Sequence, residues 1–375
     1  MNNMQENRLT FHTFNALRFF AFFRIFLLHL PVSEDNQFYK LISDGGGIGV
    51  DFFFVLSGFL ITYLLTFEKN VSGTINGFNY FSRRSLRIWP LFFTGIAIAY
   101  LNNFITATFH IGSSEGYSPN IFFSITFLEN YQMIIHNNFP NGAPLRVFWS
   151  LCVEEHFYLL WFIVFKFVSL KNMPKMFSIL WIAGIAYRIW FYIQFPQKNY
   201  YDIDVISKLD YFCAGSFISW LIAYKPALIK KVVGSINATL RNSFTFLALV
   251  FFYFYQFWEL RRIDDLYFPI ISASVFAILV ALVATSSTFI YFSEKNIFSR
   301  LGKISYGLYV FHTVVILSLI TLAKFIGISF TNGISYFLFA VLSLAFTIAI
   351  SKLSYHYLES PFLRLKKKFR SVPAG

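Results

Sequence analysis

Charged residues are scarce in this sequence, and acidic residues are the scarcest. Only 13% of the 375 residues are charged and 57% are hydrophobic, against roughly 25% and 45–50% in soluble domains. This balance excludes an ordinary soluble domain. The 31 Lys and Arg outnumber the 18 Asp and Glu, for a formal net charge of +13. Because the basic residues form short clusters between long apolar runs, we expect them to meet an anionic membrane surface or an anionic cosubstrate, and not nucleic acid.

Cysteine and cleavage signals are also lacking. Cys152 and Cys213 both lie inside apolar runs, so we expect no disulfide bond. The first apolar stretch contains Arg18, Arg24 and His29 and has no small-residue cleavage site, which favours a membrane helix over a signal peptide. No spacing of Cys and His residues suits a metal ion, and we expect no metal site.

Apolar runs, in contrast, are long and numerous. A membrane-spanning helix needs roughly 20 mostly apolar residues, and ten runs approach that length: 12–31, 48–67, 88–108, 149–165, 176–196, 205–224, 243–259, 267–291, 304–324 and 334–358. The sequence therefore predicts an all-α, polytopic integral membrane protein of about ten transmembrane helices. No remaining stretch is long enough for a soluble catalytic domain, so we expect one transmembrane domain over 1–375, with a short cytoplasmic tail at about 363–375.

Local signals place the ends of some helices. Proline lacks an amide hydrogen and fits at helix starts, so we expect Pro90 to open the third helix and Pro361 to follow the tenth. The longest connection covers 109–148. Its stretch 119–135 fits a half-inserted or interfacial helix.

The basic residues of the connections predict the orientation. With the N-terminus in the cytoplasm, the inner segments contain 20 Lys and Arg and the outer segments contain 7. Cytoplasmic loops of membrane proteins carry the excess of basic residues. Ten helices with both termini in the cytoplasm fit this rule.

Two ionisable residues of the first helix share one face. Arg18 and His29 are eleven residues apart, about three helical turns, and roughly 16 Å apart along the axis. Arg24 projects elsewhere. Ionisable groups inside membrane helices are costly and indicate function by default. With the predicted orientation, Arg18 lies in the cytoplasmic third of the helix and His29 near its outer end.

Two carboxylates are expected at the depth of His29. Asp51 begins the second helix and Glu154 begins the fourth, and both helices enter from the outside. An imidazole with a neighbouring carboxylate is the arrangement of a general base with an orienting acid. At helix starts, the same carboxylates also fit a plain structural role beside the helix dipole.

A basic cluster precedes the third helix on the cytoplasmic side. Arg83, Arg84 and Arg87 are spaced i, i+1 and i+4, a compact group that suits phosphate oxygens. The structural alternative is a topology anchor that touches anionic lipid.

Several motifs resemble one family, in the order in which that family has them. They are Arg18 with His29, GVDFFFVLSGFLI at 49–61, SRRSLRIWP at 82–90, WSLCVEEHFY at 149–158, KLDYFCAGSF at 208–217, LGKISYGLYVFH at 301–312 and YHYLESPF at 355–362. Together they resemble the acyltransferase-3 family of bacterial membrane O-acyltransferases, and they cover nearly the whole chain.

The resemblance implies acyl transfer in the bacterial inner membrane. The donor would be a cytoplasmic acyl-CoA, acetyl-CoA above all, used as a co-substrate and not as a tightly bound cofactor. The acceptor would be a hydroxyl group of a carbohydrate or another cell-envelope molecule. Some members continue into a soluble hydrolase-like domain, and this chain is expected to be a stand-alone form.

A mechanism follows as a hypothesis. The three arginines of 83–87 would hold the phosphates of coenzyme A, and its arm would pass Arg18 to reach His29. His29 would act as general base, with Glu154 or Asp51 fixing its tautomer. Direct attack on the thioester is the first choice. An acyl-enzyme on His29, Ser57 or Cys152 stays open.

Other polar residues have weaker functional signals. His312 fits either a site role or a bond between helices, and Tyr306 and Tyr309 fit packing as well as a site role. Glu359 fits a helix end paired with the basic tail, and Arg188 could extend its side chain to the membrane surface.

Two functions of other classes compete with the enzyme. A transporter or flippase would use the buried Arg and His residues to guide an anionic or sugar-linked solute. A non-catalytic sensor of acyl-CoA or lipid is the third possibility. Acyl-CoA-dependent labelling of an acceptor separates the enzyme from both.

The predicted orientation can be tested with reporter fusions. Reporters at about 75, 170, 235 and the C-terminus should be cytoplasmic, because the basic segments lie there, and those at about 40, 115, 200 and 330 should be outside. Paired phosphatase and fluorescent-protein fusions measure this. A cytoplasmic reporter at 115 would contradict the assignment of the first three helices.

Overall fold

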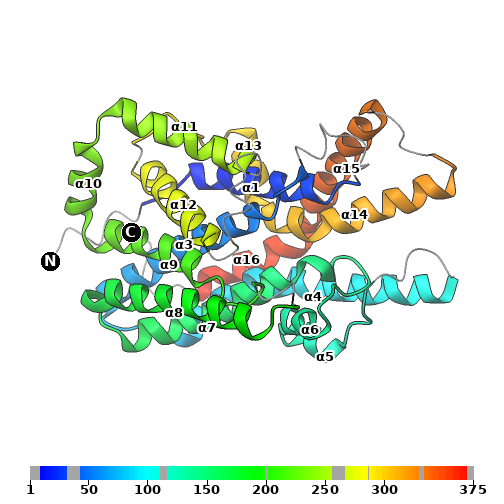
Figure 1. The fold of residues 1–375 in the computed structure, drawn as a ribbon, viewed down its shortest axis with the longest axis horizontal. Helices are drawn as coiled ribbons and strands as arrows, with labels where there is room; N and C mark the ends of the chain where they lie inside the picture. Colours follow the sequence, from blue (N-terminus) through cyan, green and yellow to red (C-terminus); the bar gives the residue numbers. More distant parts are fainter. Residues whose placement is uncertain are drawn as a thin grey trace.

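The structure is a computed structural model, and it describes residues 9–31, 43–109, 116–198, 202–255, 267–285, 287–328 and 333–369. Within these ranges there is no β-strand, and an isolated bridge joins Tyr117 and Pro140. The expectation of an all-α fold is confirmed. In Figure 1, α1 and α3 lie in the middle of the molecule, with α11 above them and α7 and α8 below.

The helices cover most of the described chain. In order they are α1 (Thr13–Leu28), α3 (Ile48–Ser72), α4 (Gly77–Phe109), α5 (Ile121–Ile125), α6 (Glu129–His136), α7 (Trp149–Phe167), α8 (Met173–Gln194), α9 (Leu209–Tyr224), α10 (Pro226–Ser235), α11 (Ala238–Phe254), α12 (Phe268–Ala284), α13 (Ile297–Lys303), α14 (Ser305–Phe325), α15 (Gly333–Ser354) and α16 (Ser360–Leu365). Short 3-10 turns are η1 (Leu145–Val147), η2 (Leu170–Asn172) and η6 (Lys366–Phe369), and η5 (Tyr355–Glu359) is a π-helical turn.

The expected count of about ten membrane spans is not confirmed. Among the described residues, five helical segments are long and apolar enough to cross a membrane: Ile48–Ser72, Gly77–Ile105, Leu170–Gln194, Ser305–Phe325 and Gly333–Phe369. The pair α9 and α10 is bent by 109° and makes a sixth if it counts as one span. The described part of the chain therefore contains five or six candidate spans by length and composition.

Each of the ten predicted runs nevertheless contains a helix. The helices α1, α11 and α12 have 16 or 17 residues, so at 1.5 Å per residue they are shorter than a hydrocarbon core of about 30 Å. Helix α7 has 19 residues but carries Glu154, Glu155 and Lys166. Hydropathy located these helices correctly but did not reveal how early they end.

Pro90 lies inside α4 and does not open it. The helix begins at Gly77, so the basic cluster lies on its first turns and not before it. Proline inside a helix removes one backbone hydrogen bond, and the Thr94 hydroxyl donates to the Pro90 carbonyl at 2.8 Å. The prediction for this proline is wrong because the apolar run, from which the start was taken, begins after the polar turns of the same helix.

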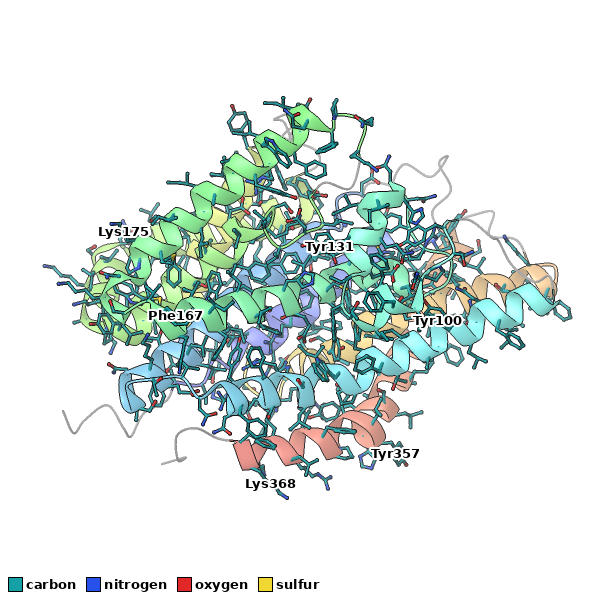
Figure 2. The ribbon with its side chains drawn as sticks, turned by 90° about the horizontal axis from the view of Figure 1, so that it is seen from below. Tyr100, Tyr131, Phe167, Lys175, Tyr357 and Lys368 are labelled. Carbon is teal, nitrogen blue, oxygen red and sulfur yellow. The ribbon has the colours of Figure 1, made fainter. Side chains whose placement is uncertain are left out.

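The C-terminal segment stays helical beyond the tenth run. Pro361 stands in the first turn of α16, and η6 follows α16 to Phe369. Both elements pack against α4. Figure 2 shows this segment beside α4, with Tyr357 and Lys368 on its outer side. Of the predicted tail, 363–369 is therefore attached to the bundle, and 370–375 lies outside the described residues.

The long connection after α4 forms two short helices where one was predicted. The helices α5 and α6 are separated at Phe127, whose φ of 60° is left-handed and breaks the helix. The buried Glu129 carboxylate accepts hydrogen bonds from Tyr117 and Ser124, both at 2.6 Å. Burial raises the pKa of Glu129 above its ordinary value, and the two hydroxyl donors oppose that rise. Helix α6 packs against α7.

Glycines bring α3 against α1 without intervening side chains. A Cβ atom at Gly46 would lie 2.6 Å from the Arg24 carbonyl oxygen, and one at Gly49 would lie 2.5 Å from the Ala21 carbonyl oxygen. Small residues permit such contact between membrane helices, where tight packing drives association. The first helix is therefore held at backbone distance from the start of α3.

Glycines also bring α3 and α9 into backbone contact. A Cβ atom at Gly58 would lie 2.2 Å from the Phe212 carbonyl oxygen, and one at Gly215 would lie 2.0 Å from the Val55 carbonyl oxygen. The Ser216 hydroxyl donates to the Gly58 carbonyl at 3.0 Å. Helix α3 is thus fixed between two neighbours.

The α3–α9 contact can be tested with Gly215→Ala. The added methyl group meets backbone, which cannot move aside cheaply, so we expect a loss of about 1–3 kcal/mol of stability. Gly234→Ala is the matched control, because no atom lies within 4 Å of its Cβ position and alanine favours a helix by about 1 kcal/mol. Thermal unfolding in detergent measures both. Equal melting temperatures for the two variants would contradict the contact.

Candidate functional site

Five helices line one cavity in the bundle. The space between their side chains amounts to about 670 Å³, including the part that is open to the surroundings. The lining residues come from α1 (Arg18), α3 (Val50, Phe53, Phe54, Ser57), α4 (Arg87, Ile88), α7 (Ser150, Leu151, Glu154, Tyr158) and α14 (Ser305, Tyr306, Tyr309). Four of the residues predicted from sequence, Arg18, Ser57, Arg87 and Glu154, therefore share one space, and so does Tyr306.

Two guanidinium groups bring positive charge into this cavity. Arg18 and Arg87 are both partly buried, and Arg18 lies within electrostatic reach of Arg87 and Glu154. Within the described residues, neither guanidinium forms a hydrogen bond or an ion pair with the protein. A guanidinium group has several N–H donors and no acceptor, so the arrangement suits an anionic ligand chemically.

Glu154 is held by two hydroxyl groups. Ser57 donates a hydrogen bond to its carboxylate at 2.5 Å, and Tyr158 donates a second one to the same oxygen. Both donors also line the cavity. The carboxylate is therefore fixed on the cavity wall, between α3 and its own helix, α7.

The three arginines at the start of α4 have different surroundings. Arg83 pairs with Glu68 at 2.7 Å and donates to the Phe369 carbonyl at 2.8 Å. The Arg84 guanidinium lies over the Tyr158 ring, 5.6 Å from its centre. Arg87 is the member that lines the cavity. The structure thus divides the predicted cluster: Arg83 attaches the C-terminal segment to α4, and Arg87 faces the same space as Arg18.

His29 lies at the end of α1 and contacts a second histidine. Its Nδ1 is 2.9 Å from the Ile25 carbonyl oxygen and 3.3 Å from Nε2 of His312 on α14. A carbonyl oxygen only accepts hydrogen bonds, so Nδ1 of His29 carries a proton and Nε2 has the lone pair. This is the tautomer that a general base requires at Nε2.

The two predicted carboxylates have other partners. Glu154 binds Ser57 and Tyr158, and Asp51 pairs with Lys208 at 3.2 Å. Among the described residues, the bonds of the His29 ring are those to Ile25 and His312. Asp51 and Glu154 therefore do not orient His29 directly in this structure, and their own roles in the site stay predictions.

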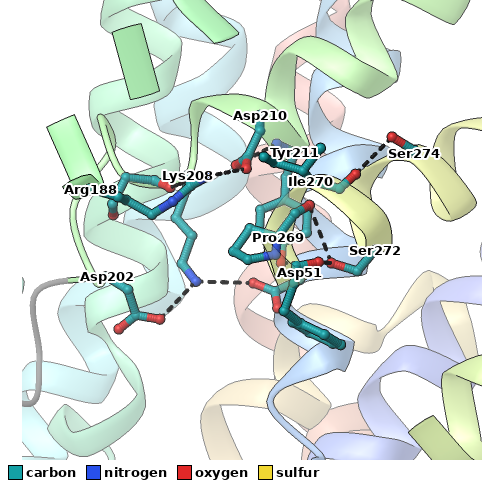
Figure 3. Close-up of polar contacts among 12 residues, drawn as sticks. Asp51, Arg188, Asp202, Lys208, Asp210, Tyr211, Pro269, Ile270, Ser272 and Ser274 are labelled. Carbon is teal, nitrogen blue, oxygen red and sulfur yellow. Dashed lines mark hydrogen bonds and ion pairs between the residues drawn. The ribbon is translucent and has the colours of Figure 1, made fainter. Parts of the chain in front are cut away.

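A network of buried charges surrounds Asp51, as Figure 3 shows. Lys208 bridges Asp51 and Asp202, at 3.2 Å each, and is 5% exposed. Next to it, Arg188 pairs with Asp210 at 2.8 Å and donates to the Ser207 carbonyl at 2.6 Å. These pairs connect α3, α8 and α9 with the loop before α9.

The structure places two of these charged residues differently from the prediction made from the sequence. Arg188 is 1% exposed, so its side chain does not reach the membrane surface; it is neutralised by Asp210 instead. Lys208 is one of the seven basic residues counted in the outer segments. In the structure its side chain is buried, because the loop before α9 turns it toward Asp51 and Asp202. The only sequence signal for these pairs was the presence of opposite charges in neighbouring apolar runs.

The remaining candidates lie around the cavity. Tyr306 donates to the Ile88 carbonyl at 2.9 Å, and Tyr309 donates to the Val147 carbonyl at 2.9 Å, so both have packing contacts as well as a place in the lining. Cys152 is fully buried and does not belong to the lining.

Glu359 is buried in the π-helical turn η5, within electrostatic reach of Arg87. The pairing of Glu359 with the basic tail stays a prediction.

The chain is similar to cell-wall acetyltransferases. It is 27% identical over 369 residues to the peptidoglycan O-acetyltransferase OatA of Listeria monocytogenes, covering 92% of this chain and 55% of the relative. It is 28% identical over 370 residues to the O-acetyltransferase OatA of Staphylococcus aureus, covering 95% of this chain and 57% of the relative. The chain thus spans about half the length of the relatives it matches.

No solved structure matches this chain. A family model described as an acyltransferase domain matches residues 11–354, which include every residue of the cavity and both histidines. That range also contains the Arg18–His29 pair and most of the other motifs on which the resemblance rests. The chain therefore belongs to the acyltransferase-3 family.

Proposed function

We propose that this protein is a membrane O-acyltransferase that moves an acetyl group from acetyl-CoA to a hydroxyl group of a cell-wall carbohydrate. The family membership and the relatives named as O-acetyltransferases, one of them for peptidoglycan, support this activity. They favour an enzyme over the transporter alternative. The candidate spans support a place in the membrane, and the charge of the connections supports cytoplasmic termini in the inner membrane.

One observation carries the proposal. The cavity extends from the guanidinium groups of Arg18 and Arg87 to Tyr309. Tyr309 precedes His312 by one helical turn and accepts a hydrogen bond from its ring at the backbone carbonyl. Arg18, Arg87 and Tyr309 thus line one space. Neither histidine belongs to its lining, but Tyr309 contacts His312, and His312 contacts His29.

Acetyl-CoA would enter the cavity beside Arg18 and Arg87. Coenzyme A carries several phosphates on its nucleotide end, and Arg donors match phosphate oxygens. Arg18 and Arg87 would bind these oxygens or the polar groups of the arm next to them. The partners that satisfy Arg83 argue for a structural role of that residue, so the donor site proposed here rests on Arg18 and Arg87, with Arg84 beside them.

The chemical step would use His29 as general base. The acceptor oxygen attacks the thioester carbon while Nε2 of His29 takes the hydroxyl proton. The carbon–sulfur bond then breaks, and the thiolate of coenzyme A takes that proton to leave as a thiol. Direct transfer remains the proposal. Ser57 is the alternative acyl carrier, since it lines the cavity and donates to a carboxylate, whereas the burial of Cys152 outside the lining argues against that thiol.

The proposed donor site predicts that neighbouring arginines differ in their contribution to acetyl-CoA binding. Arg18→Gln and Arg87→Gln should each weaken acetyl-CoA binding by about 10-fold or more, because a hydrogen bond to a charged group contributes about 1.5–3 kcal/mol. Arg83→Gln is the control and should bind normally. Calorimetry on protein in nanodiscs measures all three. A loss of affinity in Arg83→Gln alone would contradict the assignment.

If His29 is the general base, its replacement should abolish acetyl transfer and leave acetyl-CoA binding intact. His29→Ala should reduce ester formation by about 10²–10⁴-fold, and His29→Gln should fail similarly because an amide cannot take the proton. Acetyl-CoA affinity should stay unchanged in both. The assay follows labelled acetyl groups from acetyl-CoA to peptidoglycan fragments. Wild-type rates of ester formation by purified His29→Ala would exclude histidine from the mechanism and refute this reading of the site.

A further inference from the structure

His312 is a buried polar side chain that the proposed mechanism does not yet use. Its side chain is fully buried on α14, yet it lies against the one imidazole assigned to chemistry. The two rings are 4.9 Å apart between centres and nearly perpendicular, at 72°. Nε2 of His312 points at Nδ1 of His29, 3.3 Å away.

The backbone determines which nitrogen of His312 carries the proton. Its Nδ1 lies 2.6 Å from the Tyr309 carbonyl oxygen. Since a carbonyl only accepts, Nδ1 of His312 is protonated and its Nε2 presents a lone pair. His29 has a proton on the nitrogen that faces it. The single Nδ1 proton of His29 therefore has two acceptors: the Ile25 carbonyl at 2.9 Å, and Nε2 of His312 at 3.3 Å as the longer branch.

Packing holds the His312 ring in this orientation. The Phe22 ring of α1 lies edge-on against it, 5.8 Å between centres. Tyr309 is fixed in turn, because its hydroxyl donates to the Val147 carbonyl at 2.9 Å and lies 2.6 Å from Ser150 Oγ. A ring with a fixed carbonyl partner and an aromatic wall cannot turn freely, so its lone pair stays directed at His29.

We infer that His312 is the positioning residue of His29, the part that a carboxylate plays in a Ser-His-Asp triad. A neutral imidazole in this place keeps the proton of His29 on Nδ1 and its lone pair on Nε2. When Nε2 takes the proton of the acceptor hydroxyl, the ring becomes a cation and its hydrogen bond to His312 becomes charge-assisted and stronger. The proton stays on His29 until the thiolate takes it. This inference rests on the proposed function.

The contact also explains why no carboxylate is needed beside His29. Asp51 and Glu154 both have partners elsewhere in the protein. His29 and His312 together supply base and support from two helices, α1 and α14, which pack against each other. His29 then takes the proton of the acceptor hydroxyl between these two helices, in the neighbourhood of Tyr309 in the cavity lining.

The test compares two substitutions of His312. His312→Leu removes the acceptor nitrogen and should reduce kcat by about 10- to 100-fold, the equivalent of one hydrogen bond to a charged group, with acetyl-CoA affinity unchanged. His312→Gln places an amide oxygen where Nε2 was and should recover much of that loss. A purely structural role would instead affect both variants through unfolding, which thermal unfolding with bound acetyl-CoA detects.

A spectroscopic readout makes the test independent of activity. The chain has seven histidines, so ¹⁵N-histidine spectra are simple, and comparison with His29→Gln assigns the His29 signals. The wild type should show His29 with its proton on Nδ1, and His312→Gln should keep that tautomer. In His312→Leu the Ile25 carbonyl still accepts from Nδ1 of His29, so the tautomer should persist, and a shifted Nδ1 signal of His29 supports the inference. If His312→Leu does not fold, the rate of His312→Gln and its His29 Nδ1 signal still decide.

The outcomes separate this inference from the proposed function. If His312→Leu keeps kcat within about twofold and the His29 Nδ1 signal does not shift while His29→Ala is inactive, His312 has no positioning role and the base assignment stands. If His29→Ala is fully active, the base assignment fails and this inference fails with it, whereas acyl transfer itself stands. In the background of His29→Ala, removal of His312 should cost little more, because groups that act as one unit are non-additive.

Discussion

Backbone contact at glycine is the constraint on which the arrangement of this protein depends. Helix α3 meets α1 through Gly46 and Gly49, and meets α9 through Gly58 and Gly215. A side chain at any of these positions would separate the helices by its own width. Because α3 also carries Ser57 and Asp51, the spacing of the cavity wall and of the Lys208 network follows from these contacts. The polar site is therefore built on helix contacts at backbone distance.

The basic residues inside the described bundle form two groups. Some are neutralised by groups of the protein, and others face the cavity. Arg24 is bound by the carbonyls of Ser43 and Asp44, Arg188 by Asp210, and Lys208 by two aspartates. Breaking such a buried pair costs about 3–5 kcal/mol, so these residues belong to the scaffold. Arg18 and Arg87 lack such partners in the described structure and face the cavity. This contrast separates the arginines of the scaffold from the two that we propose for the donor site.

Much of this division could not be predicted from the sequence. Hydropathy places helices and alternation sets their direction, and on that basis we expected Arg18 in the cytoplasmic third of its helix and Glu154 at the depth of His29. In the structure Arg18 and Glu154 instead line one cavity, together with Ser57. Hydropathy could not determine which helices are neighbours. The contact between His29 and His312 joins residues 283 positions apart, on α1 and α14, and nothing in the period of either helix indicates it.

Helix ends were the second failure of prediction. The run 267–291 gave a helix that ends at Ala284, because the Thr285 hydroxyl donates to the Ala281 carbonyl and the backbone turns there. Hydropathy counts such hydroxyl residues as mildly polar and extends the helix through them. Pro90 was misplaced for the opposite reason, since the polar first turns of α4 lack the apolar character by which its start was sought.

The pairing of Arg188 with Asp210 has a consequence for how the protein is made. The two residues are on consecutive helices, α8 and α9, and their charges cancel only when both helices are in place. An arginine alone in the middle of a membrane helix costs about 2.5–3.5 kcal/mol on insertion. During synthesis α8 emerges first, with its partner still in the ribosome. We therefore expect the segment from Leu170 to Tyr224 to enter the bilayer as a hairpin, with the translocon holding α8 until its acidic neighbour arrives.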